Sequence, residues 1–123
     1  GLIHLLKVKL FPNPHIRTTG FFINSDDLLE VKVNKEKLVK KIETNYFESG
    51  RNSLSNQLLK KGFRLIIVNS DNKYFDINEW NKSKTFCLDD QEKLIFLDNK
   101  TNQFLRASNK IKEKMTKSHW GNI

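Results

Sequence analysis

The sequence is poor in the residues that mark several classes of protein. It has one Cys and five Gly among its 123 residues. A single Cys cannot form an internal disulfide, so a disulfide-stapled secreted miniprotein is excluded. The scattered Gly residues form no glycine-rich loop of the kind that cradles phosphates. The three His are far apart in sequence and Cys87 stands alone, so no zinc-binding spacing exists and we expect neither a metal nor a cofactor.

Long hydrophobic runs are also absent. No stretch approaches the roughly 20 apolar residues that a transmembrane helix needs. Lys7 and Lys9 interrupt the opening segment, which therefore lacks the apolar core of a signal peptide. We expect an intracellular, cytoplasmic protein with no membrane partner.

Acidic residues are scarce at both ends of the chain. The whole sequence has 22 Lys and Arg against 14 Asp and Glu, a net charge of +8. Residues 1–25 contain three bases and no acid, and residues 100–123 contain six bases and one acid, whereas the middle is nearly neutral. A composition of 18 Lys, 4 Arg and 14 Asn is typical of AT-rich coding genomes, which supply lysine without selection for function. The position of the charge is therefore more informative than its total, and it favours an anionic partner at the two ends.

The chain does contain enough apolar material for a core. Hydrophobic residues make up 37%, including nine Phe, which excludes a wholly disordered basic tail. The length lies near the commonest single-domain size. We expect one domain over residues 1–118, followed by a short C-terminal tail at 119–123.

The first half of the chain predicts strands followed by two helices. Residues 2–11 alternate imperfectly and predict a strand, and residues 20–33 predict a hairpin that turns at 24–27. Asn34 is a plausible N-cap for a helix that continues to about residue 48. A shorter helix is predicted over residues 53–61, with Gly62 just past its end.

The second half predicts further strands and a final helix. Residues 63–68 are the most hydrophobic stretch and read as a strand buried on both faces. A turn at 70–73, a strand pair at 85–88 and 94–97, and a helix from about 103 to 118 follow. The order predicts an α+β fold, in which a small antiparallel or mixed β-sheet accompanies two central helices and a C-terminal basic amphipathic helix.

The strongest functional signal lies in that last helix. Arg106, Lys110, Lys114 and Lys117 recur at steps of four, four and three residues. This spacing predicts a basic stripe that could contact a phosphate backbone, although a solvated charged face would look the same. Trp120 could stack on a base or could fold back onto the domain as an anchor.

We therefore expect a non-enzymatic binding module that acts on nucleic acid or on a nucleic-acid-containing complex. The phosphate contacts would come from the C-terminal stripe, with Trp120 as a stacking group, and from three cations of the acid-free opening segment: Lys7, Lys9 and Arg17. The sequence leaves open the oligomeric state and the choice between DNA and RNA.

Two alternatives belong to other functional classes. The first is a small toxin-like ribonuclease that works without metal, with His15 as acid or base and Arg17 on the developing negative charge. A second His is available at position 4, but the sequence places no second catalytic group beside His15. The other alternative is a protein-interaction domain, of the kind that phages and mobile elements encode, which binds an acidic partner surface. Cys87 reads as a small buried hydrophobic residue in all three interpretations.

Overall fold

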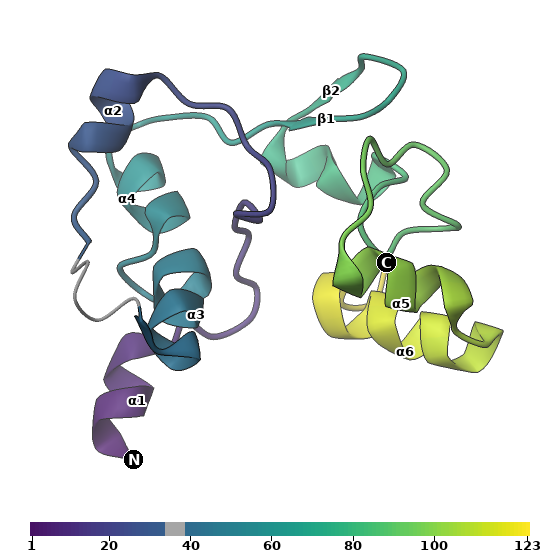
Figure 1. Ribbon diagram of the computed structural model, residues 1–123, viewed down its shortest axis with the longest axis horizontal. Coiled ribbons are helices and arrows are strands. Elements are labelled where there is room, and N and C mark those ends of the chain that lie inside the picture. Colours follow the sequence, from purple (N-terminus) through teal and green to yellow (C-terminus); the bar gives the residue numbers. More distant parts are fainter. Residues whose placement is uncertain (34–38) are drawn as a thin grey trace. The chain divides into compact units, whose positions relative to one another are not determined.

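The structure, a computed structural model, describes residues 1–33 and 39–123, which divide into two units at Leu65 (Figure 1). The first unit is Gly1–Leu65 and the second is Ile66–Ile123. Helices are combined with a small two-stranded antiparallel sheet, so the α+β class is confirmed. That residues 1–118 fold as a single domain stays a prediction. No helix in the described part of the chain is both long and apolar enough to cross a membrane.

The first unit contains four helices among its described residues. They are α1 (Leu2–Lys7), α2 (Ser25–Leu29), α3 (Lys41–Ser49) and α4 (Leu54–Lys60). The strand expected over residues 2–11 is therefore wrong. Leu2, Leu5 and Leu6 have the three- and four-residue spacing of one helix face, and they remain exposed. The polar residues of α1 make its contacts instead. The alternation of apolar and polar residues therefore did not indicate which face of this segment packs against the rest of the unit.

The hairpin expected over residues 20–33 is also wrong. Its presumed turn is the start of α2, where the Asn24 side chain caps the helix by accepting a hydrogen bond of 2.9 Å from the Asp26 N–H. Asp26 and Asp27 occupy the first turn, where negative charge is favourable. Asn, Ser and Asp serve both turns and helix N-termini, which explains the error.

The central helices follow their local signals more closely. In α4, Ser53 is the N-cap and accepts a hydrogen bond from the Asn56 N–H, and Gly62 follows the helix with φ of 85°, as expected. The longer helix is present as α3, and Gly50 follows its last residue, Ser49. Its expected N-cap, Asn34, lies outside the described residues.

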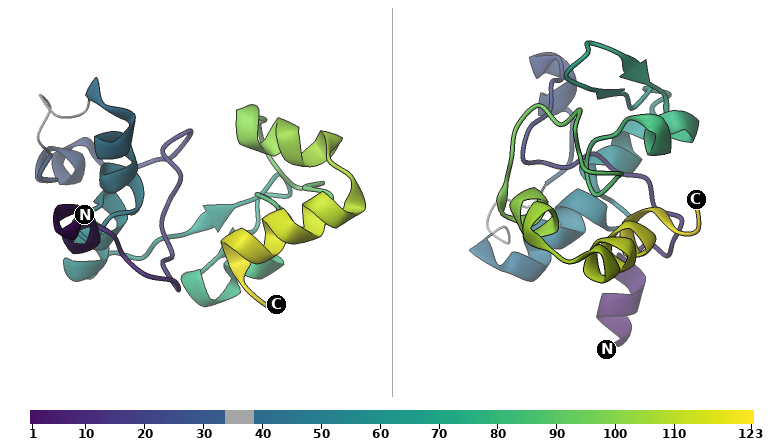
Figure 2. Two further views of the ribbon diagram at one scale, coloured as in Figure 1. Left: turned by 90° about the horizontal axis from the view of Figure 1, so that it is seen from below. Right: turned by 90° about the vertical axis from the view of Figure 1, so that its right-hand side faces the viewer.

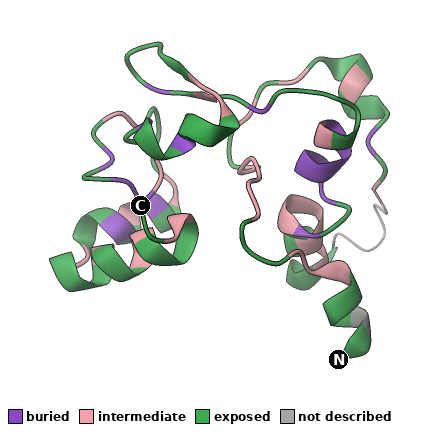
Figure 3. Ribbon diagram, turned by 180° about the vertical axis from the view of Figure 1, so that it is seen from behind, coloured by how far each residue is buried: buried purple, intermediate pink, exposed green. Residues whose placement is uncertain are grey.

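Helix α4 is the buried element of the first unit, and most of its buried residues are polar (Figure 3). The Gln57 side chain accepts a hydrogen bond from the Lys32 N–H at 2.7 Å and donates to the Lys32 carbonyl at 2.8 Å. Asn56 donates to the carbonyl of Gly50 at 2.9 Å. These side chains satisfy loop backbone that has no sheet or helix partner, which is why they can be buried.

The second unit contains a short hairpin, a 3₁₀ helix and two α-helices. They are β1 (Ile67–Val68), β2 (Tyr74–Phe75), η2 (Ile77–Lys82), α5 (Asn99–Arg106) and α6 (Asn109–Trp120). The turn expected at 70–73 is confirmed, since Ile67 pairs with Phe75 and Val68 with Tyr74. The strand over 63–68 is shorter than expected and is not buried on both faces, since Ile66 and Val68 are exposed.

The strand pair expected at 85–88 and 94–97 does not form. Four non-glycine residues between 84 and 91 have positive φ angles: Lys84, Cys87, Asp89 and Gln91. Such angles reverse the chain repeatedly and are incompatible with an extended strand. The resulting loop buries Cys87, as the sequence predicted, together with Leu88 and Gln91.

The helix expected from 103 to 118 is two helices. Ala107 is extended, with ψ of 154°, and Ser108 precedes α6 as its N-cap residue. α5 begins earlier than expected because Asp98 and Thr101 form a capping box. α6 continues to Trp120, so the first two residues of the expected tail are helical (Figure 2).

Candidate nucleic-acid interface

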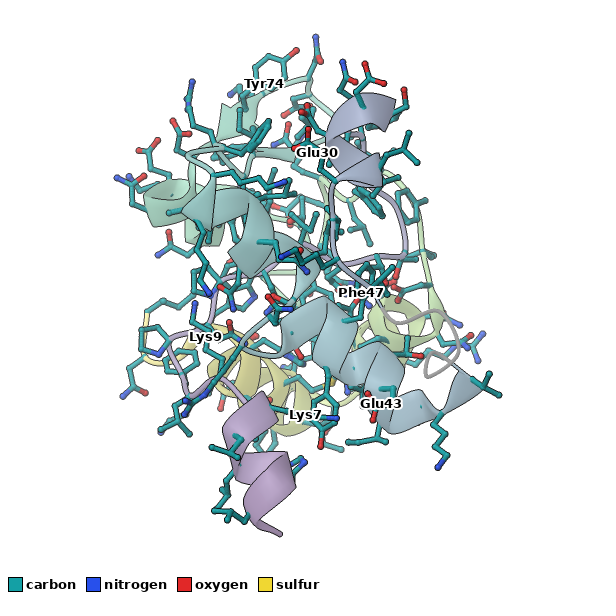
Figure 4. The ribbon with its side chains drawn as sticks, turned by 90° about the vertical axis from the view of Figure 1, so that its left-hand side faces the viewer. Lys7, Lys9, Glu30, Glu43, Phe47 and Tyr74 are labelled. Carbon is teal, nitrogen blue, oxygen red and sulfur yellow. The ribbon has the colours of Figure 1, made fainter. Side chains whose placement is uncertain are left out.

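Lys7, one of the expected phosphate contacts, is engaged within the first unit. Its Nζ lies 3.3 Å from Glu43 Oε1 of α3 and 5.1 Å from the centre of the Tyr46 ring (Figure 4). The side chains of this pair are partly covered. One turn earlier on α1, His4 Nδ1 forms a hydrogen bond with the Tyr46 hydroxyl. These contacts attach α1 to α3, so binding of a phosphate by Lys7 competes with its intramolecular partners.

Lys9 and Arg17 lie on the segment that covers α3 and α4. Lys9 Nζ donates to Asn56 Oδ1 at 2.7 Å, which again uses the cation internally. Arg17 is half-buried and also has an interaction within the chain. Beside it, the Thr18 N–H and hydroxyl both donate to Glu48 Oε1, at 2.8 and 2.9 Å. The acid-free sequence of residues 1–25 is therefore supplied with carboxylates from α3.

In helix α6, one face makes contacts within the second unit and the opposite face is exposed. We call these the held face and the open face. On the held face, Thr116 donates to the Cys87 carbonyl at 2.8 Å, and Lys112 Nζ lies 3.1 Å from Asp90 Oδ1. Lys112 also lies over the Phe104 ring, 5.6 Å from its centre. These contacts orient the helix about its axis, and they turn the remaining lysines outward.

The open face carries a row of three cations, which we call the basic row: Lys110, Lys114 and Lys117. At 3.6 residues per turn they fall within an arc of about 60° and span about 10 Å along the helix. All three are exposed, and none of their ammonium groups forms an ion pair or hydrogen bond with another residue in the described ranges. The sequence predicted this stripe, but it included Arg106 as its first member. Arg106 is exposed at the end of α5, on the other side of the break at Ala107.

Trp120 folds back onto its own unit as an anchor, which is the second of the two alternatives expected for it. Its Nε1 donates to the Phe86 carbonyl at 2.8 Å, and the residue is half-buried. The neighbouring His119 packs its ring against Phe86, with centroids 4.8 Å apart. The end of α6 is thus anchored to the loop that precedes α5.

His15 has one ring nitrogen committed. Its Nδ1 lies 2.8 Å from the Asn13 carbonyl oxygen, which can only accept, so Nδ1 carries the proton. In the neutral ring the Nε2 atom then has the lone pair. His4 is held on α1 by Tyr46, in a different set of contacts. Among the described residues, no group of three or more His, Cys, Asp and Glu is arranged to hold a metal ion.

One ion pair of the second unit has shifted pKa values. A backbone hydrogen bond and then the Lys84 ammonium lower the pKa of Glu92, and the Glu92 carboxylate raises the pKa of Lys84. Both groups are exposed, and their nitrogen and oxygen atoms lie 3.1 Å apart. The pair braces the strained loop and is separate from the basic row.

The sequence could not reveal which lysines of each unit are paired with a carboxylate. Lys112 is paired with Asp90, 22 residues away, and Lys7 is paired with Glu43, 36 residues away. By contrast, the break before α6 had a local signal, since Ser108 is a good N-cap residue. Comparisons with protein-family models, with curated proteins and with solved structures find no significant match to this chain.

Proposed function

We propose that this chain is a non-enzymatic module that binds nucleic acid, or a complex containing it, through phosphate contacts from the basic row of α6. The observation that carries the proposal is the difference between the two groups of cations. Lys7 and Lys9 are committed to internal partners, whereas the basic row is exposed on a helix whose opposite face is fixed. A rigid row of unpaired ammonium groups is suited to release counterions from a phosphate backbone.

Salt dependence of binding tests this proposal. The triple variant K110A/K114A/K117A removes up to three phosphate contacts, so the slope of log affinity against log salt should flatten by up to about 2.7. Between about 50 and 200 mM salt, the affinity of the triple variant should therefore fall about 40-fold less than the affinity of the wild type. Fluorescence anisotropy with a labelled duplex measures both quantities.

A matched control separates the row from net charge. The variant K41A/K60A/K73A removes the same number of exposed lysines from elsewhere on the chain. It should retain most of the wild-type slope. If both variants weaken binding equally, the row is not a site; if wild type binds no nucleic acid but purifies with an acidic protein, the protein-interaction alternative replaces the proposal.

Arg106 and Arg17 are proposed as secondary contacts. Arg106 is exposed three residues before α6 starts, so it can extend contacts beyond the row. Arg17 would have to exchange an internal interaction for a phosphate. A single alanine variant at either position should reduce the salt slope by less than about 0.9, the value for one phosphate contact.

A second candidate, the metal-independent ribonuclease, is favoured by the hydrogen bond of His15, which leaves the Nε2 atom of the neutral ring as an acceptor. With the proton held on Nδ1 by the Asn13 carbonyl, Nε2 can accept a proton from a ribose hydroxyl. Arg17, two residues later, would stabilise the developing charge. Cleavage of RNA by the pure protein in the presence of a chelator, lost in H15A and in R17A, would establish it; its absence over a range of RNAs removes this candidate.

A further inference from the structure

The aromatic side chain nearest to the basic row is occupied by an internal contact. Trp120 donates its Nε1 to the Phe86 carbonyl at 2.8 Å, and His119 packs edge-on against the Phe86 ring. These are the two aromatic rings of α6, and both are in contact with Phe86. The basic row therefore has charge, but the aromatic rings of its own helix are engaged with the loop before α5.

The other exposed aromatic residues of the unit lie elsewhere. Tyr74 is on β2, at the end of the unit away from α6 (Figures 1 and 4). Phe96 lies in the loop before α5. Proteins that bind single strands combine a basic surface with aromatic side chains on which successive bases stack, whereas both aromatic rings of α6 have contacts within the unit.

We infer that the basic row takes the backbone of double-stranded nucleic acid in preference to a single strand, and without reading its sequence. This inference rests on the proposed function. A duplex carries one charge per about 1.7 Å of axis, so a duplex segment as long as the row carries about six phosphate charges, against about three for one strand. Without stacking, charge density decides which form is bound more tightly.

The size of the preference follows from counterion release. Three contacts give salt slopes of about −2.7 for a duplex and −2.1 for a single strand. If the two forms bind with equal affinity at about 1 M salt, the affinity for the duplex is about sixfold higher at about 50 mM salt and about threefold higher at about 200 mM. The ratio should therefore fall as salt rises.

The experiment uses the full chain with a labelled DNA duplex of about 20 base pairs, one of its strands alone, and a second duplex of unrelated sequence. We expect the two duplexes to bind equally and both to bind more tightly than the single strand by the stated ratios. F96A should leave the ratio unchanged, and K110A/K114A/K117A should weaken both forms.

Three results would overturn the reasoning at different levels. Equal or tighter binding of the single strand, still lost in the triple lysine variant, overturns the duplex preference and leaves the proposed function standing. A duplex ratio that rises in F96A shows that Phe96 stacks on bases, which also overturns the preference. Binding that is absent, or unchanged in the triple variant, overturns the proposed function itself.

Discussion

The side chain of Gln91 is the sharpest test of the structure, because it satisfies two buried backbone groups at once. Its Oε1 accepts from the Cys87 N–H at 2.9 Å and its Nε2 donates to the Thr101 carbonyl at 3.0 Å. Gln91 itself is 4% exposed. These two hydrogen bonds connect the strained loop to α5, so the substitution Gln91→Ala should destabilise the second unit strongly.

The expected size can be worked out from the two hydrogen bonds that are lost. The buried Cys87 N–H loses the acceptor that Gln91 provides, at about 1–3 kcal/mol, whereas the Thr101 carbonyl lies inside α5 and keeps its helical hydrogen bond, so its loss costs about 1 kcal/mol. Q91A should therefore lower the free energy of unfolding by about 3 kcal/mol. With a urea dependence of about 1 kcal/mol per molar for so small a unit, the midpoint should fall by about 3 M. Tryptophan fluorescence is the appropriate probe, because Trp80 and Trp120 both belong to this unit.

Two further variants keep the test decisive if Q91A does not fold. Q91E retains the acceptor but, when ionised, cannot donate to Thr101. Burial favours its neutral form, so the stability of Q91E should rise as the pH falls from 7 to 5, when the protonated carboxyl can donate again. Gln103 is exposed in α5, and Q103A should change stability by less than about 0.5 kcal/mol. A midpoint for Q91A close to that of Q103A, or no pH dependence in Q91E, would refute the two hydrogen bonds.

Two more predictions concern the same loop. Asp89 has φ of 47° and is exposed, so D89G should be more stable than D89A by about 1 kcal/mol in urea unfolding, because only glycine adopts this angle without strain; equal stabilities would contradict the left-handed conformation. A backbone hydrogen bond and then the ion pair with Lys84 lower the pKa of Glu92 below its ordinary value of 4.5. Its stabilisation is therefore present above about pH 4.5 and is lost as the pH falls through the lowered value, so E92Q should remove part of the decline in thermal midpoint on acidification; an unchanged acid limb would contradict it.

Local signals predicted the elements whose ends are marked by capping residues. Ser53 and Gly62 bracket α4, and both have the roles that their residue types favour. Where one residue type serves two structures, the prediction went wrong: Asn24 starts a helix rather than a turn. The strands at 85–88 and 94–97 failed because apolar composition does not reveal backbone angles such as that of Cys87.

The candidate site divides in the same way between local and tertiary information. Lys110, Lys114 and Lys117 share a face because helical periodicity alone places them together, and the sequence was sufficient to predict that row. Whether a cation is open or paired depends on residues distant in the chain. Glu43 engages Lys7, and Asp90 engages Lys112.

The sequence by itself therefore determined that the protein is basic at its two ends, has one buried Cys, belongs to the α+β class and carries a periodic row of lysines near its C-terminus. Only the tertiary structure decided which end of the chain keeps its charge available. Charge is a property of residues, but its availability depends on which carboxylates and carbonyls the fold brings within hydrogen-bonding distance. The opening segment meets acceptors from α3 and α4, whereas the outer face of α6 meets none among the described residues.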